Sequence, residues 1–205
     1  MNDRISIGVV LFDGFELLDV FGPLEMFGLL PDHFELCLVA VNGDTVASNQ
    51  GPRSVVDFGF DNSPQFNMLL VPGGSGTRRE VSNSVLLEWL TSQAENARYV
   101  TSVCTGSALL ARAGLLDGRR ATTNKAAFDW VTSQSDEVDW QKQARWVKDE
   151  RFFTSSGVSA GMDMSLALIA EITDLDTATQ VAIWSEYEWH QNPGWDPFAA
   201  IHGLV

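Results

Sequence analysis

Apolar residues along the chain form short continuous runs, separated by longer segments with helical spacing. Four runs have the length of a buried strand: residues 5–12 (ISIGVVLF), 34–41, 68–71 and 99–103. Six segments have the apolar spacing of helices: 16–30, 81–97, 107–116, 126–133, 160–173 and 177–189. Strands that alternate with helices predict an α/β fold with a mainly parallel central sheet and helices on both faces.

Two further segments have a different pattern. Residues 46–58 are more polar, are interrupted by Gly and Pro, and predict a hairpin. Residues 190–205 (HQNPGWDPFAAIHGLV) are rich in aromatic residues and proline, so we expect an irregular tail that wraps the surface or meets a partner subunit. Because the chain contains no repeat, linker or low-complexity segment, we interpret residues 1–205 as a single domain.

Composition and charge narrow the class of protein. The chain has 205 residues and a formal net charge of −14, and its Lys and Arg residues are scattered. A nucleic-acid partner is therefore not expected, since phosphate contacts need clustered basic residues. The N-terminus lacks the basic region of a signal peptide, and no apolar run reaches the roughly 18 residues of a membrane span. We expect a cytoplasmic protein without a membrane partner.

The stretch YVTSVCTGSALL, which contains Cys104, is the first candidate for chemistry. It places the cysteine where a buried strand turns into a helix, as in a nucleophile elbow, and Gly106 gives the backbone room to bend. The positive end of the helix dipole predicts a thiol pKa below about 8.5. The alternative is a small buried apolar side chain, which is our interpretation of Cys37. The two cysteines are too far apart in sequence to indicate a disulfide framework or a zinc site.

Two other turns follow predicted strands, residues 12–14 (FDG) and residues 72–76, and both should meet Cys104 at one edge of the sheet. Residues 72–76 (PGGSG) form either an oxyanion-stabilising loop or a plain tight turn. Asp19 lies among apolar residues in FELLDVFGPLEMF, where Pro23 makes the helix irregular. Its carboxyl group is either buried with a raised pKa, or exposed in the first turn of the helix.

A cysteine nucleophile usually has a histidine base. The chain contains only His33, His190 and His202, and none of them follows a predicted core strand. His33 falls in a predicted surface loop and the other two in the tail, so the sequence gives little support for a Cys–His triad.

The motifs FDGFELLDVFGPLEMF, LLVPGGSGT and ARYVTSVCTGSALLARAGLLDGRRATTN resemble the ThiJ/PfpI superfamily of glutamine amidotransferase-like proteins. With SSGVSAGMDMSLALIAE they extend the resemblance in order over residues 5–189, and ARYVTSVCTGS is especially similar to the isonitrile (isocyanide) hydratases. The resemblance implies a flavodoxin-like three-layer α/β sandwich, a nucleophile elbow and, usually, a dimer.

The resemblance also implies the site residues. Cys104 takes the position of the nucleophile, and Asp19 that of the acidic partner. The backbone N–H groups of Thr105 and Gly74 would form the oxyanion site, and substrate would also contact Gly73, Asn124 and Gly157. In many relatives the ATT motif ends in histidine, where this chain has Asn124. This difference argues against protease and glyoxalase chemistry, both of which depend on a Cys–His pair.

The activity implied by the resemblance is that of a cysteine-dependent hydro-lyase. Cys104 would attack the terminal carbon of an isonitrile, Asp19 would relay protons through a thioimidate, and the product would be an N-substituted formamide. No metal or organic cofactor is implied. Alternatives within the superfamily are a redox-sensing or stress-response protein with an oxidisable Cys104, a glyoxalase- or amidase-type hydrolase, and a ligand-sensing module.

The expected partners are a small-molecule substrate and a second copy of the chain. Four aromatic residues near the C-terminus make this surface unusually apolar: Trp184, Trp189, Trp195 and Phe198. We therefore expect a homodimer that buries part of this surface.

Overall fold

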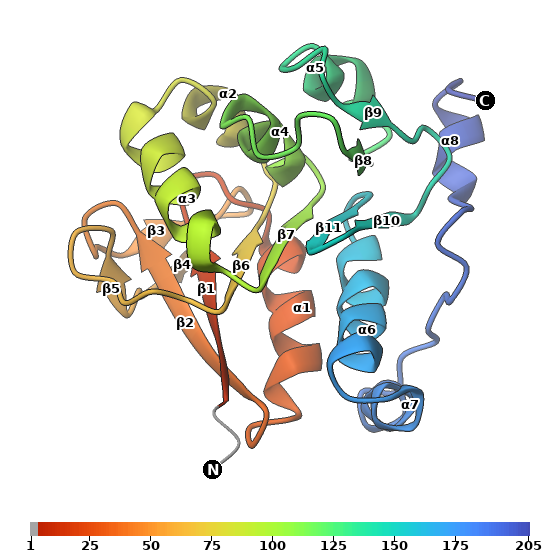
Figure 1. Ribbon diagram of the computed structural model, residues 1–205, viewed down its shortest axis with the longest axis horizontal. Helices are drawn as coiled ribbons and strands as arrows, with labels where there is room; N and C mark the ends of the chain where they lie inside the picture. Colours follow the sequence, from red (N-terminus) through yellow and green to blue (C-terminus); the bar gives the residue numbers. More distant parts are fainter. Residues whose placement is uncertain (1–3) are drawn as a thin grey trace.

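A computed structural model describes residues 4–205 and contains a central seven-stranded sheet (Figure 1). The strands, in their order across the sheet, are β10 (Trp146–Asp149), β11 (Phe152–Ser155), β7 (Tyr99–Val103), β6 (Met68–Val71), β1 (Ile5–Val10), β2 (Phe34–Ala40) and β5 (Phe58–Gly59). All neighbouring strands are parallel except β10 and β11, which pair antiparallel through a tight turn. This confirms the predicted α/β fold with a mainly parallel sheet.

Helices cover both faces of the sheet. The helices are α1 (Leu17–Gly28), α2 (Thr77–Glu80), α3 (Ser84–Asn96), α4 (Gly106–Arg112), α5 (Phe128–Thr132), α6 (Ala160–Ile172), α7 (Leu175–Trp184) and α8 (Pro197–Ile201). Helices α1 and α6 pack together on one face, with α7 beside α6, and α3 and α4 lie on the other (Figure 1). Within residues 4–205, no helix combines the length and apolar character needed to cross a membrane.

The core lies between the sheet and the two helical layers. Its largest fully buried side chains include Phe15, Phe27, Phe66 and Phe153. The central strands β6 and β7 are buried along their whole length, which explains their continuous apolar or β-branched sequences. The same burial fixes the carboxyl ends of these strands, where the candidate site is found.

Several predicted elements differ from the observed ones. Strands β10 and β11 were not expected, because the apolar run of β11 is only Phe152 and Phe153 before polar but buried Thr154 and Ser155. Helix α1 continues through Pro23, although Pro23 has no N–H to donate to the carbonyl group of Asp19. Helix α7 ends at Trp184, earlier than predicted, and is followed by Glu186 with a positive φ of 48°.

The remaining segments are short. The predicted hairpin over residues 46–58 is present as the antiparallel pair β3 (Val46–Ala47) and β4 (Arg53–Ser54). A second small sheet pairs β8 (Arg120–Ala121) with β9 (Asp139–Trp140). The tail is not irregular throughout, since residues 197–201 form α8, which lies beside the β8–β9 region (Figure 1).

Candidate active site

Cys104 lies at the turn between β7 and α4, as the sequence predicted. Its φ of 57° is in the left-handed region, which is strained for a residue other than glycine. Such strain persists only where the surroundings enforce it, and it is concentrated at functional sites. The side chain is almost completely buried, with 6% of its surface exposed. The conformation is that of a nucleophile elbow.

Hydrogen bonds to both backbone groups of Cys104 hold this strained conformation. The Cys104 N–H donates to the carbonyl oxygens of Ser155 and Ser156, each 3.2 Å away. Its carbonyl oxygen accepts from the hydroxyl groups of Thr123, at 2.9 Å, and Ser107, at 3.1 Å. Strand β11, missed in the sequence, therefore supplies part of the support for the elbow.

Gly106 is required by the close approach of the elbow to β6. A Cβ atom at this position would lie 2.8 Å from the carbonyl oxygen of Pro72 and equally close to the carbonyl carbon of Val71. Any larger residue would push α4 away from the end of β6. The glycine thus serves tight packing, and not only the freedom to bend that the sequence suggested.

The turn formed by residues 72–76 contacts Thr105 beside the cysteine. The Gly74 N–H donates to Thr105 Oγ1 at 3.1 Å, and the Thr77 hydroxyl lies 3.0 Å from the same oxygen. Thr105 itself provides hydrogen bonds to the Cys104 sulfur from its backbone N–H and its side chain. Thr105 and Gly74, the two residues predicted to form the oxyanion site, are thus neighbours, and the Gly74 N–H donates to a hydroxyl group.

Asp19 in the first turn of α1 is completely buried, which excludes the exposed alternative. Its Oδ2 atom accepts a hydrogen bond from the Gly73 N–H at 2.9 Å. Among residues 4–205, its Oδ1 atom has no hydrogen-bond partner. Burial raises the pKa of this carboxyl group to about 8, and the hydrogen bond from Gly73 opposes the rise. The group therefore holds a proton near neutral pH, as one of the two sequence interpretations required.

Cys104 and Asp19 are close enough for each to shift the pKa of the other. Burial, followed by the charge of Asp19, raises the pKa of the Cys104 thiol, and hydrogen bonds from Thr105 and Asn124 lower it only in part. The sequence-based expectation of a lowered pKa is therefore wrong. The helix dipole argument assumed a solvated sulfur, whereas this sulfur is enclosed.

Asn124 and Gly157 lie on the other side of the sulfur. The Asn124 side chain is a hydrogen-bond partner of Cys104 and also accepts from the Ala127 N–H at 3.0 Å. A Cβ atom on Gly157 would overlap the Asn124 amide and lie 3.1 Å from Cys104 Sγ. The structure thus brings together all seven predicted site residues: Cys104, Asp19, Gly73, Gly74, Thr105, Asn124 and Gly157.

The tail brings further residues to the site that the sequence did not suggest. A pocket of about 330 Å³ starts at Asn124 and Gly157 and extends to Phe198 and His202 of the tail. His202 is exposed at this pocket, while His33 and His190 are exposed elsewhere. The sequence signal that could have located α8 is Asp196 followed by Pro197, a residue pair typical of a helix start.

Cys37 is the other free cysteine of the chain. It lies half-buried in β2, so the expectation of a buried side chain is correct only in part. It is therefore a suitable internal reference for the reactivity of Cys104.

Comparison with known proteins agrees with this geometry. A model of the DJ-1/PfpI family matches residues 5–171, and the chain therefore belongs to the DJ-1/PfpI family. It is 37% identical to the isonitrile hydratase of Pseudomonas putida, over 89% of this chain and 78% of that protein. A solved ThiJ/PfpI family protein from Pseudomonas syringae has a TM-score of 0.83 and 32% identity, covering 92% of this chain and 77% of that one. The predicted family is confirmed.

A different class of relative also matches. The HTH-type transcriptional regulator GbdR of Pseudomonas aeruginosa is 31% identical over 91% of this chain. The match covers 52% of the regulator, so this chain spans about half the length of that protein. The family thus includes an enzyme and a regulator at comparable identity, and the chemistry of the site has to discriminate between these functions.

Proposed function

We propose that this protein is an isonitrile hydratase, which converts an isonitrile and water to an N-substituted formamide. The observation that carries the proposal is the pairing of a cysteine on a strained elbow with a buried carboxyl group whose pKa is about 8. Hydration of an isonitrile needs a nucleophile and a proton donor at the same carbon, and a protonated carboxyl group supplies the second. The 37% identity to the Pseudomonas putida enzyme supports this choice of substrate.

In the first step, the Cys104 sulfur forms a bond with the terminal carbon of R–N≡C. The carboxyl group of Asp19 gives its proton to that carbon and takes the thiol proton in exchange. The product of this step is a thioimidate, Cys–S–CH=N–R, and the carboxyl group is again protonated. Hydrogen bonds from Thr105 and Asn124 stabilise negative charge on the sulfur while the S–C bond forms.

In the second step, water adds to the thioimidate carbon while Asp19 donates a proton to nitrogen and accepts one from the water. The tetrahedral adduct then collapses with cleavage of the C–S bond, and the hydroxyl proton returns to sulfur by way of Asp19. The products are R–NH–CHO and the free thiol, so one water is consumed and no redox change occurs.

The test is formamide production from cyclohexyl isonitrile by the purified protein, measured by chromatography. Cys104→Ala and Cys104→Ser should abolish turnover. Asp19→Asn should lower kcat by roughly 10² to 10⁴, the contribution of general acid–base catalysis, and Asp19→Glu should retain part of the activity. Cys37→Ala is the matched control and should leave turnover unchanged, because Cys37 lies in β2 away from the elbow. Turnover that survives in Cys104→Ala would refute the mechanism.

The likeness to GbdR favours a second candidate, a ligand-sensing domain in which the same pocket binds a small molecule without turnover. In that case calorimetry would detect binding of cyclohexyl isonitrile to the wild type and to Cys104→Ala with equal affinity. No formamide would form in either sample.

A further inference from the structure

Two cavities on the tail side of the molecule share part of their walls. One is the pocket of about 330 Å³ that starts at Asn124 and Gly157, the neighbours of the Cys104 sulfur. The other has a volume of about 510 Å³ and is lined by Trp189 and Trp195, among others. Phe198 and Ser159 line both cavities, and the Phe198 ring is the larger of the two shared side chains. The ring is therefore placed where it limits how far a molecule bound at Cys104 can extend.

The pocket beside the cysteine is mainly apolar. Leu18 of α1, Ala126 and Val158 line it together with Phe198, and the Lys125 ammonium group beside it is already engaged. Lys125 Nζ donates to Thr122 Oγ1 at 2.7 Å and to the Ala144 carbonyl oxygen at 2.6 Å. The lining thus favours an apolar substituent, with Asn124 as a polar group next to the sulfur. Ser156, Ser159 and the exposed His202 complete the wall.

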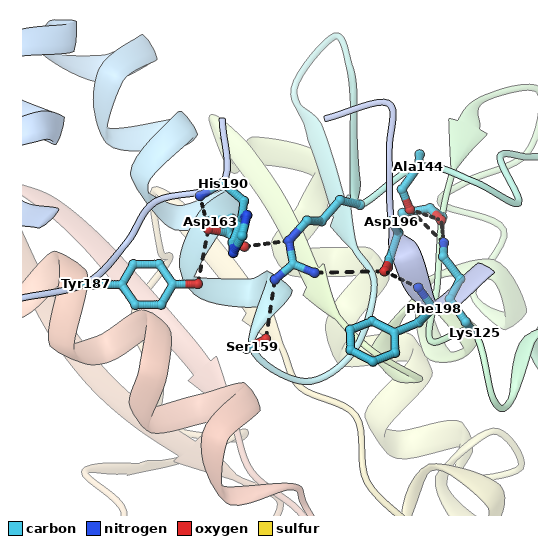
Figure 2. A network of polar contacts seen from close by, with 10 residues as sticks. Lys125, Ala144, Ser159, Asp163, Tyr187, His190, Asp196 and Phe198 are labelled. Atoms are coloured by element: carbon cyan, nitrogen blue, oxygen red, sulfur yellow. Dashed lines mark hydrogen bonds and ion pairs between the residues drawn. The ribbon is translucent and has the colours of Figure 1, made fainter. Parts of the chain in front are cut away.

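A buried polar network holds the tail in this position (Figure 2). The carboxylate of Asp196 accepts from the Phe198 N–H at 3.1 Å and lies 3.9 Å from Arg145. The backbone on either side is also tied down, since the Asp196 N–H donates to Gln143 and the Arg145 N–H donates to Pro193. Arg145 in turn pairs with buried Asp163. Phe198 therefore projects from an anchored segment and not from a free chain end.

We infer that Phe198 is a specificity-determining residue that restricts the substrate to isonitriles with a compact apolar substituent. This inference rests on the proposed function for the identity of the reactive group, while the size limit follows from the two cavities. Removal of the ring should join the pocket to the second, aromatic-lined cavity. The enlarged space would then accept bulky aryl substituents.

The direct test compares kcat/KM for cyclohexyl isonitrile and 2-naphthyl isonitrile in the wild type, Phe198→Ala and Phe198→Trp. We expect Phe198→Ala to raise the naphthyl-to-cyclohexyl ratio by about tenfold or more, in the range that pocket size supplies, and Phe198→Trp to lower it. Ile201→Ala is the matched control, since Ile201 is on the same helix, is 69% exposed and is outside the lining of both cavities. It should leave the ratio unchanged. A ratio that stays constant in both Phe198 variants would overturn the inference.

A second readout separates this inference from the proposed function. Alkylation rates of Cys104 with iodoacetamide and with N-(1-naphthyl)iodoacetamide, followed by mass spectrometry, report access to the sulfur without any need for turnover. Phe198→Ala should accelerate the bulky reagent selectively, with Cys37 as the internal reference. If this occurs and no isonitrile is hydrated, the pocket inference stands and the proposed function fails. If isonitriles are hydrated but Phe198→Ala changes neither the kcat/KM ratio nor the relative alkylation rates, the proposed function stands and the pocket inference fails.

Discussion

Asp19 and Asp163 are both completely buried, but their surroundings differ. Asp19 accepts a hydrogen bond from the Gly73 N–H and has the Cys104 thiol as its other hydrogen-bond partner, and no cation pairs with it within residues 4–205. Asp163 accepts from Arg145 Nε at 2.6 Å, from the Tyr187 hydroxyl at 3.1 Å and from the His190 N–H at 2.9 Å. Figure 2 shows the groups around Asp163 converging on it from different segments.

This difference separates a carboxyl group suited to proton transfer from one that holds the structure together. A buried carboxyl group with few partners is more stable when protonated, and the pKa of Asp19 is accordingly about 8. A carboxylate with a guanidinium partner and two further donors can remain charged at that depth. Burial alone therefore does not separate a carboxyl group suited to proton transfer from a structural carboxylate; the number and charge of its partners decide.

The largest effect that this comparison predicts is on stability. Asp163→Asn should lower the free energy of unfolding by about 3–5 kcal/mol, because it leaves the buried Arg145 guanidinium without its closer anion and with only Asp196, 3.9 Å away. Asp19→Asn should change it by no more than about 1 kcal/mol at pH 6, since an amide is neutral like the protonated carboxyl group and can still accept from Gly73. Urea denaturation of the two variants measures both values. Equal losses of stability would show that Asp19, like Asp163, is a charged carboxylate that holds the structure together.

The second prediction concerns the pH dependence of stability. The Asp19 pKa is about 8 in the folded protein, against 3.8 for an ordinary aspartate. Between these values the folded state holds a proton that the unfolded state has lost. Stability due to this group therefore falls as pH rises, by about 1.4 kcal/mol per pH unit, and levels off above pH 8.

Urea unfolding of the wild type and Asp19→Asn, at three pH values between about 5 and 7.5, isolates this contribution. The wild type should lose stability relative to the variant at each step upward. The raised pKa of Cys104 does not interfere, because this thiol is protonated in both the folded and unfolded states over that range. Parallel pH profiles would mean that Asp19 is ionised in the folded protein.

The positions of Cys104 and Asp19 could be predicted from the sequence because they depend on local patterns. A β-branched run followed by Cys-Thr-Gly-Ser predicts a strand-to-helix turn, and an acid within an apolar helix predicts a carboxyl group close to the core. The protonation state of Cys104 could not be predicted, since it depends on how deeply the finished fold encloses the sulfur. The partner of the Gly74 N–H could not be predicted either, because it is a hydroxyl group 31 residues further along the chain.

The residues that the tail contributes to the site could not be predicted from local sequence patterns. Phe198 and His202 reach the pocket only because Asp196 and the backbone at 193 pair with the segment around Arg145. Such contacts between segments far apart in sequence leave no periodicity. Strand β11 was missed for a related reason, since Thr154 is polar yet buried, with its hydroxyl oxygen accepting from the Thr122 N–H at 2.9 Å.

A third buried aspartate, Asp196, extends the comparison, and its substitution is expected to have the smallest effect on stability. Its Oδ1 atom caps α8 through Phe198, it lies 3.9 Å from Arg145, and its Oδ2 atom has no hydrogen-bond partner among residues 4–205. Asp196→Ala should cost about 0.5–2 kcal/mol, the usual loss for an N-cap, and Asp196→Asn should cost less, because Asn caps equally well. Both losses should be smaller than that of Asp163→Asn, since Arg145 keeps its closer partner.

Hydrogen exchange at the amides of α8 measures the change locally, and urea denaturation measures it globally. If the cap dominates, Asp196→Ala should speed exchange at Phe198 and Ala199 while Asp196→Asn leaves it nearly unchanged. If Asp196→Asn is as damaging as Asp196→Ala, the negative charge next to Arg145 is what holds the tail. In that case Asp196 belongs with Asp163 as a structural carboxylate, and only Asp19 remains as a buried acid free to transfer a proton.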